Sequence, residues 1–223
     1  MAAIVWDAVG NHKYETGTDH GVLYKQDAQG AYTSGYAWDG LTGVTETPSG
    51  ADSTDFWADN IKYASVRAAE TFNFTIEAYQ SPKEFDECDG SASISTGVTI
   101  GQQGRKPFGF SYRSKIGSDL VNANSEDAPY KLHLIYGATA SPSDKGYTTI
   151  NDSPDAITLS WECGTTPVNV KIGNQVFKPT SLLTIDSSLV DRAKLTALET
   201  VLYGDDNTDP RLPLPAEVAQ LLA

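Results

Sequence analysis

The chain has 223 residues and a formal net charge of −13, from 29 acidic and 16 basic side chains. This balance argues against a nucleic-acid-binding module, which would present a stripe of basic residues. A hydrophobic fraction of 39%, with 4 Trp, 11 Tyr and 7 Phe, is enough for a substantial core. No apolar run approaches the length that spans a bilayer.

The two cysteines, Cys88 and Cys163, are too few for a disulfide scaffold. Both fall on apolar faces of predicted elements, so we interpret them as buried free thiols. Residues 1–7 contain no basic residue and reach an acid at once, which is not the pattern of a secretory signal. These features favour a chain that folds in a cytoplasm.

The first part of the chain is rich in Gly, Asp and Tyr and has only weak periodicity. Residues 1–35 therefore predict an extended N-terminal arm, with one short strand near residues 21–24. Residues 1–60 hold nine acidic residues against two lysines, so much of the negative charge lies here.

Residues 36–66 predict a long hairpin whose polar, exposed tip covers residues 47–55. The tip begins with a Pro-Ser-Gly turn, after a first strand that ends at Glu46. A second turn, at Asp59 and Asn60, leads into the last strand of the hairpin.

The stretch from residue 71 to 79 places Phe and Ile on one face and Thr, Asn and Glu on the other, which predicts a half-buried strand. A helix is predicted directly after it, with Ser81 as the cap and Pro82 at the first position. Phe85 and Cys88 follow at helical spacing. We expect this helix to flank one face of the surrounding β-structure.

Beyond residue 90 the pattern is of strands separated by polar loops. The strand expected at residues 108–113 carries three aromatic residues on one face, and the strand at 130–136 alternates in the same way. Alternation is clearest at residues 156–163. Residues 168–172 and 176–177 predict a hairpin across a Gly-Asn turn.

A second helix is predicted to begin at the capping residue Asp191 and to end at Gly204. Leu195, Leu198 and Leu202 recur within it at intervals of three and four. Residues 205–223 predict a C-terminal arm that ends in one more short helix.

These elements together predict a mainly β fold. We expect a β-sandwich or barrel with a flanking α-helix, a long hairpin and extended terminal arms. Neither a linker nor an internal repeat divides the sequence, so residues 1–223 are expected to form a single domain.

The sequence shows no group of residues with the spacing of a known catalytic site. His12, His20 and His133 share no metal-ligand spacing, and His133 lies on the polar face of its strand, which predicts a solvated side chain. Four carboxylates surround the predicted helix at residues 84–89, and two of them, Glu84 and Glu87, have the chemistry of a glycosidase pair or of calcium ligands. A solvated helix face is the interpretation we favour. We therefore expect no enzyme, no metal site and no cofactor.

Short motifs follow one another along nearly the whole chain. They are residues 14–17 (YETG), 19–24 (DHGVLY), 37–42 (AWDGLT), 47–51 (TPSGA), 58–63 (ADNIKY), 75–79 (TIEAY) with Phe85 and 88–90 (CDG), 101–103 (GQQ), 108–113 (FGFSYR), 131–137 (KLHLIYG), 140–143 (ASPS) and 151–154 (NDSP). No single motif is diagnostic, but their ordered succession resembles the major tail tube proteins of bacteriophages with long, non-contractile tails, the siphophage type.

The resemblance implies a tail tube fold, a β-sandwich or barrel with a helix at its flank, that also recurs in the tube of the type VI secretion machine. It implies that six copies form a ring and that rings stack into a hollow tube, which later conducts DNA into the host cell. The implied partners are other copies of the chain, the tape-measure protein, the tail initiator or baseplate, and the tail terminator. The implied location is the virion tail, after assembly in the cytoplasm of the host bacterium.

Exposed segments are the natural contacts between rings, so we expect them at the hairpin tip and the N-terminal arm. The expected contact residues are Pro48, Ser49, Gly50, Ala51, Asp52, Trp57, Asp59 and Asn60. Part of the negative charge is expected to face the lumen, where it would repel DNA, which carries about one negative charge per 1.7 Å of axis.

A binding module is the alternative: an acidic β-sandwich that recognises a carbohydrate or a host surface. It requires exposed aromatic residues gathered on one loop face, whereas most aromatic residues here alternate into strands. Among virion proteins, the nearest alternative is a tail terminator or another tail tube paralogue, which would share the expected fold but cap the tube instead of extending it.

Overall fold

The structure is a computed structural model that describes residues 4–150, 152 and 155–223. It is mainly β, with 48% strand and 10% helix. The motif at residues 151–154 lies largely outside the described residues. The strands are β1 (Tyr14–Gln26), β2 (Tyr32–Ala37), β3 (Leu41–Gly50), β4 (Ser53–Ala58), β5 (Ile61–Arg67), β6 (Glu70–Ala78), β7 (Ala92–Ser95), β8 (Val98–Ile100), β9 (Phe108–Gly117), β10 (Tyr130–Ala140), β11 (Leu159–Thr165), β12 (Val168–Ile172), β13 (Gln175–Thr180) and β14 (Leu182–Asp186); the helices are α1 (Arg192–Tyr203) and α2 (Pro215–Leu221), and Lys83–Phe85 form a 3-10 turn.

An eight-stranded antiparallel sheet forms the body, in the order β2-β1-β9-β10-β11-β6-β3, and β14 also pairs with β10. The strand β10 divides its pairing, because residues 131–135 bond to β14 and residues 138–140 bond to β11. Gly137 lies at the division with φ of 62°, and a Cβ there would meet the carbonyl oxygen of Thr166 at 2.1 Å. Only glycine fits this crossing, so this residue lets one strand serve both halves of the sheet.

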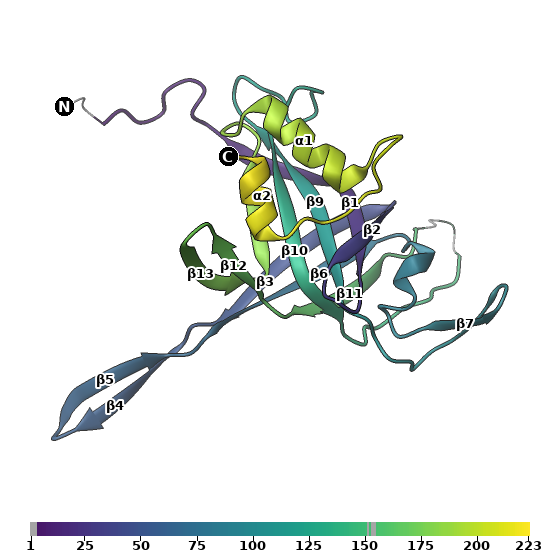
Figure 1. The fold of residues 1–223 in the computed structure, drawn as a ribbon, viewed down its shortest axis with the longest axis horizontal. Coiled ribbons are helices and arrows are strands. Elements are labelled where there is room, and N and C mark those ends of the chain that lie inside the picture. Colours follow the sequence, from purple (N-terminus) through teal and green to yellow (C-terminus); the bar gives the residue numbers. More distant parts are fainter. Residues whose placement is uncertain (1–3, 151, 153–154) are drawn as a thin grey trace.

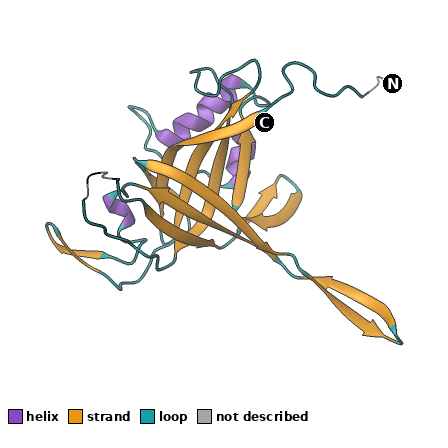
Figure 2. Cartoon of the chain, turned by 180° about the vertical axis from the view of Figure 1, so that it is seen from behind, coloured by secondary structure: helices purple, strands orange, loops and turns teal. Residues whose placement is uncertain are grey.

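The two halves of the sheet face each other across an aromatic core. Phe74 of β6 and Phe110 of β9 stack with ring centroids 6.1 Å apart, and Trp38 packs edge-on against Phe110 and Trp161. Figure 2 shows the strands of the long hairpin crossing the back of the central strands at an angle. Phe108, Phe110 and Tyr112 all belong to this core, so the prediction that the three aromatic residues of 108–113 share one face is confirmed.

Helices α1 and α2 cover the opposite face of the central strands (Figure 1). Leu132 and Leu134 of β10 pack there with Leu195, Leu198 and Leu202 of α1, all fully buried. The predicted ends of α1 are also confirmed. Its N-cap carboxylate accepts hydrogen bonds from the N–H groups of residues 193 and 194, and the residue after the helix is a glycine at φ of 77°.

The helix predicted at residue 81 is wrong. Only Lys83–Phe85 adopt a 3-10 turn, without a side-chain cap. Phe85 and Cys88 are nevertheless buried, since the Phe85 ring packs edge-on against Trp161 and Phe108. A segment this short forms too few helical hydrogen bonds to offset the unfavourable free energy of helix nucleation. The aromatic contacts of Phe85 hold the turn in place instead. The flanking helix of this fold is α1.

The predicted N-terminal arm is too long. Of the described residues, 4–13 precede β1, a strand of 13 residues that pairs with both β2 and β9. Leu23 packs in the aromatic core and Tyr24 packs under the helices. Both side chains are fully buried. The strand predicted at residues 21–24 is the buried part of β1, while residues 14–20, which extend it, are exposed or half-buried and show no apolar alternation.

The long hairpin is displaced from its predicted bounds of 36–66. A turn at residues 38–40 divides the expected first strand, and the hairpin runs from β3 to β6 with β4 and β5 at its far end. The Pro-Ser-Gly stretch does not form a turn. It belongs to β3, in which Pro48 pairs with Phe72 of β6. Proline is tolerated there because β3 is an edge strand. The true tip is Asp59-Asn60, both at positive φ as a two-residue hairpin turn requires.

The predicted C-terminal arm over residues 205–223 is packed onto the body. Leu212 and Val218 are buried, and the isolated bridge between Tyr32 and Leu212 ties the segment to β2. Arg211 donates to the Glu217 carboxylate, which fixes the start of α2. The predicted hairpin at residues 168–177 is confirmed as β12–β13, and the strand predicted from residue 156 begins at Leu159.

Candidate assembly surfaces

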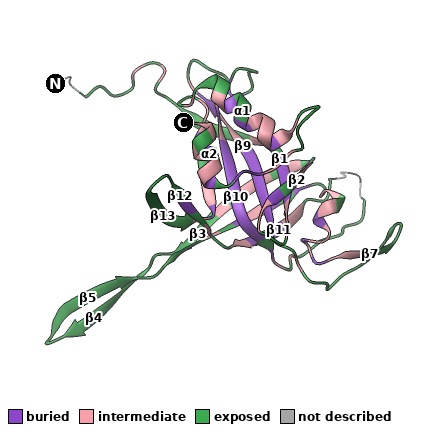
Figure 3. Cartoon of the chain, viewed as in Figure 1, coloured by how far each residue is buried: buried purple, intermediate pink, exposed green. Residues whose placement is uncertain are grey.

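The hairpin β4–β5 projects from the body and is exposed along its whole length (Figure 3). It carries five large apolar side chains that are 52–75% exposed: Phe56, Trp57, Ile61, Tyr63 and Val66. An isolated two-stranded hairpin is marginally stable in water at best, and apolar groups gathered on a surface mark a site of interaction. The far end of the hairpin is therefore the first candidate assembly surface.

The expected contact residues separate into two groups. Trp57, Asp59 and Asn60 lie together at the tip. The other five do not belong to the tip: Pro48, Ser49 and Gly50 pair with β6 at the base, and Ala51 and Asp52 join the two ladders. Sequence reasoning missed the apolar residues of the tip other than Trp57, although they flank the turn predicted at Asp59 and Asn60.

The link between base and tip has a constrained backbone. Gly50 and Ala51 both have positive φ, at 87° and 57°, and a Cβ at Gly50 would meet the carbonyl oxygen of Ala69 at 2.4 Å. Across the link, the Ala68 N–H donates to the Asp52 carbonyl at 2.9 Å. The ladder thus changes direction here, and the direction of the tip is set by the backbone of these few residues.

A polar cluster fastens the hairpin base to the central strands. The Tyr112 hydroxyl of β9 donates to Glu46 of β3 at 2.7 Å, and the His133 ring of β10 lies flat on the Tyr112 ring. His133 Nδ1 is 3.3 Å from the same carboxylate oxygen but forms no hydrogen bond with it, while Nε2 is 3.0 Å from the Ser114 hydroxyl. His133 is buried, so the prediction of a solvated histidine is wrong: β3 covers what was expected to be an open face.

The neighbours of Glu46 stabilise its ionised form. The His133 imidazole and the Tyr112 hydroxyl hold the pKa of Glu46 below its usual range, against the opposite effect of its burial. Burial and the neighbouring Glu46 raise the pKa of Tyr112. The carboxylate therefore stays ionised and the phenol stays a donor at neutral pH.

The outer face of β3, β6 and β11 is polar and bears no lysine or arginine. Its side chains are mostly hydroxyl and amide groups, with Glu77 and Glu162 exposed among them. A shallow hollow of about 360 Å³ lies on it between Thr47, Asn73 and Glu162. Among the described residues β6 is the only strand that pairs with β3, so the outer edge of β3 is open.

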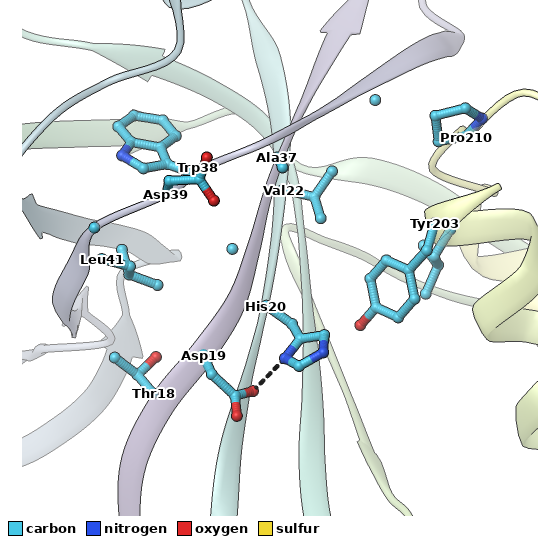
Figure 4. A pocket seen from close by; sticks show the side chains of 14 residues that line it. Thr18, Asp19, His20, Val22, Ala37, Trp38, Asp39, Leu41, Tyr203 and Pro210 are labelled. Carbon is cyan, nitrogen blue, oxygen red and sulfur yellow. Dashed lines mark hydrogen bonds and ion pairs between the residues drawn. The ribbon is translucent and has the colours of Figure 1, made fainter.

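A pocket of about 550 Å³ opens beside β1, β2 and the end of α1 (Figure 4). Its walls include Val22, Leu41 and Tyr203, and its polar corner is the pair of Asp19 and His20, 2.8 Å apart. Asp19 also accepts from Arg113 Nε at 3.0 Å. Burial pushes the pKa of Asp19 up, but Arg113 and His20 outweigh it and hold the value below the usual range. The polar groups of this pocket are already engaged with one another.

Two of the four carboxylates at residues 84–89, Glu87 and Asp89, form surface ion pairs. Glu87 bonds to Lys106 Nζ at 2.6 Å and lies 3.4 Å from Lys25 Nζ, and Asp89 bonds to Lys145 Nζ at 2.7 Å. Within residues 4–150, 152 and 155–223, no three His, Cys, Asp or Glu side chains come together in a way that would hold a metal ion.

None of the helices in the described part of the chain has the length and hydrophobicity needed to cross a membrane. No protein-family model matches the sequence, and no curated protein matches it.

Proposed function

We propose that this chain is a structural virion protein that polymerises as stacked, six-membered rings into the tail tube of a siphophage. The observation that carries the proposal is the projecting hairpin, whose apolar side chains have no partner within the described chain. The ordered motifs of the sequence are its second support. Under the proposal the fold is of the tail tube type, and the hairpin tip contacts the next ring.

The open edge of β3 and the polar face beside it suit a hollow tube. Head-to-tail contacts whose rotation closes give a ring, and a sheet edge can pair with a strand of the neighbouring copy. Such pairing would carry the face with Glu77 and Glu162 around the lumen. Carboxylates and hydroxyl groups repel or release phosphates, so DNA would pass without binding.

The partners under this proposal are further copies of the chain, the tape-measure protein, the tail initiator or baseplate, and the tail terminator. The protein would be assembled in the cytoplasm of the host bacterium and reside in the virion tail. It would have no enzymatic activity and no cofactor.

The test is negative-stain electron microscopy of the purified full chain at high concentration, with sedimentation velocity beside it. We expect hollow tubes or stacked rings. If the protein stays monomeric, immunogold labelling of virions is the deciding measurement, since nucleation of the tube belongs to the initiator. A monomer that is also absent from tails would overturn the proposal.

A binding module remains the second candidate, since Phe56, Trp57 and Tyr63 are exposed together on one hairpin. Aromatic side chains of this kind stack on sugar rings and anchor protein interfaces. A glycan array and a cell-binding assay test this function directly. Binding that is lost in Trp57→Ala, in a protein that never forms tubes, would favour it.

A further inference from the structure

The strand β14 has an outer backbone edge that is open at Thr184. On either side of it, the N–H and carbonyl of Leu182 bond to the Thr180 hydroxyl, and the Asp186 carbonyl accepts from the Leu189 N–H. The bonds from Ser187 N–H to the Tyr130 carbonyl and from Tyr136 N–H to the Ser181 carbonyl fix which residues of this segment face β10. Because bonding alternates along an antiparallel pair, residues 181, 183, 185 and 187 point their backbone groups at β10. Thr184 therefore points both its N–H and its carbonyl away from the sheet. No other strand of the described chain pairs with this edge.

The open edge lies in an apolar groove of about 490 Å³. One wall is the ribbon β12–β13, through Val170 and Ile172, and the floor is α2, through Val218 and Leu222. Leu189 borders the groove and is 84% exposed. Unpaired backbone groups between apolar walls are the features of a site for strand addition, in which a peptide gains hydrogen bonds from the edge and burial from the walls.

The N-terminal arm has the complementary features. Ile4, Val5, Trp6 and Val9 are 72–77% exposed, and their β-branched and aromatic side chains favour a strand, yet none belongs to one. Asp7 has φ of 55° in the monomer, so the arm is not extended there. Once extended, residues 4–9 would span about 20 Å, against about 17 Å for the five residues of β14. Their alternation would place Ile4, Trp6 and Ala8 on one side of an added strand.

The arm is directed away from its own body. Gly10 N–H donates to both carboxylate oxygens of Asp119, at 2.9 and 3.1 Å, and this fixes the root of the arm beside the loop after β9. Beyond that root, residues 4–9 lead outward (Figure 1). The groove that such an arm would enter thus belongs to another copy.

We propose that residues 4–9 of one copy add as a strand to the open edge of β14 in the next copy, with Trp6 against α2. The inference rests on the proposed function, because it names a contact through which copies of the chain would join. It assigns to the arm and the groove a role that the hairpin tip does not fill.

The experiment is a cysteine scan in the full chain. One tagged copy carries Thr184→Cys, and a second copy carries a single cysteine at each arm position from 4 to 9 in turn. The native Cys88 and Cys163 are 1% and 2% exposed, so only the introduced thiols react with mild oxidant. We expect the strongest disulfide between copies at one arm position, much weaker ones two residues to either side of it, and none at the positions between, because side chains of a strand alternate between its faces and a disulfide needs Cα atoms within about 7 Å.

Proline variants provide the matched control. Thr184→Pro removes an N–H that the monomer does not use, so the variant should fold but bind the arm less well. Thr184→Val keeps the N–H and should retain arm binding, and sedimentation of the mixed copies measures both variants. Cross-links at no arm position, or only within one chain, would overturn the inference. A Trp57→Cys copy that reacts in place of the arm would identify the hairpin tip as the occupant and overturn it too. Tubes without arm cross-links would overturn the inference and leave the proposed function intact. Arm cross-links without tubes would support the inference and contradict the proposed function.

Discussion

The rings of Tyr112 and His133 lie parallel, with centroids 4.5 Å apart and an interplanar angle of 2°. Both residues face Glu46, which comes from a strand of the long hairpin. Three elements that are distant in sequence therefore meet at one carboxylate. The cluster is the polar fastening between the hairpin base and the central strands.

The first prediction concerns acid. Because the pKa of Glu46 is lowered in the folded protein, its contribution is complete above the unfolded glutamate pKa of about 4.3 and is lost as pH falls through the lower, folded value. Glu46→Gln should cost about 1.5 kcal/mol at pH 7, the scale of a hydrogen bond to a charged group, and flatten the decline in stability below pH of about 4. Urea unfolding followed by tryptophan fluorescence measures both. Glu77→Gln, an exposed glutamate on β6, is the control, and equal slopes for the two variants would contradict the prediction.

The second prediction separates stability from assembly. Replacement of β4 and β5 by an Asn-Gly turn removes only exposed residues, so the free energy of unfolding should change by no more than about 0.5 kcal/mol. The same variant should form no tubes. Trp57→Ala should weaken assembly in the same direction, while Val176→Ala, which removes an equally exposed apolar group from β13, should not. Normal tubes from the shortened chain would exclude the tip as a contact between rings.

The third prediction concerns the division of β10. Gly137→Ala should destabilise the fold by at least about 2 kcal/mol, because the new Cβ meets the Thr166 carbonyl and the backbone is at positive φ. Gly104→Ala, where the added carbon meets no atom within 4 Å, is the matched control and should stay near wild type. Thermal unfolding of both variants, followed by circular dichroism, gives the comparison. Equal midpoints would show that the crossing strand tolerates a side chain.

The fourth prediction tests the lumen. In assembled tubes, Glu77→Lys combined with Glu162→Lys should retain short duplex DNA at low salt and release it as salt rises, as counterion release requires. Wild-type tubes should retain none. Asp127→Lys adds a positive charge on an exposed loop elsewhere and serves as the control. If this control retains DNA as well as the lumen variant does, the face of β3, β6 and β11 does not line the channel.

Hydrophobic periodicity in the sequence predicted the strands and helices that have one buried and one exposed face. The alternation at residues 108–113 is correct because the aromatic core lies on one side of β9, and α1 was visible from its Asp191 cap, its leucine spacing and Gly204. Only the buried part of β1, residues 21–24, was predicted as a strand, because the exposed and half-buried residues 14–20 carry no apolar alternation. Burial of His133 depends on β3, which is about 90 residues away in the chain, so no local pattern could show it.

The contact residues show the same limit. Turn composition placed Pro48, Ser49 and Gly50 at a tip, but the register of β3 with β6 takes them into the ladder. Composition can identify residues that are able to turn, whereas strand pairing decides which of them do so. The open edge of β14 likewise emerges only from the register, since the direction of each backbone group follows from its partner.

The pairing of the hairpin with β11 has a mechanical consequence. A pull on the tip acts along β6, and β6 is held to β11 by six paired residues, from Leu159 with Ala78 to Gly164 with Asn73. Ladder hydrogen bonds lie perpendicular to the strands, so such a force shears the whole set at once instead of opening it bond by bond. Tension on the tip is thus spread over a full strand and passes through β11 into β10, the strand that the helices cover.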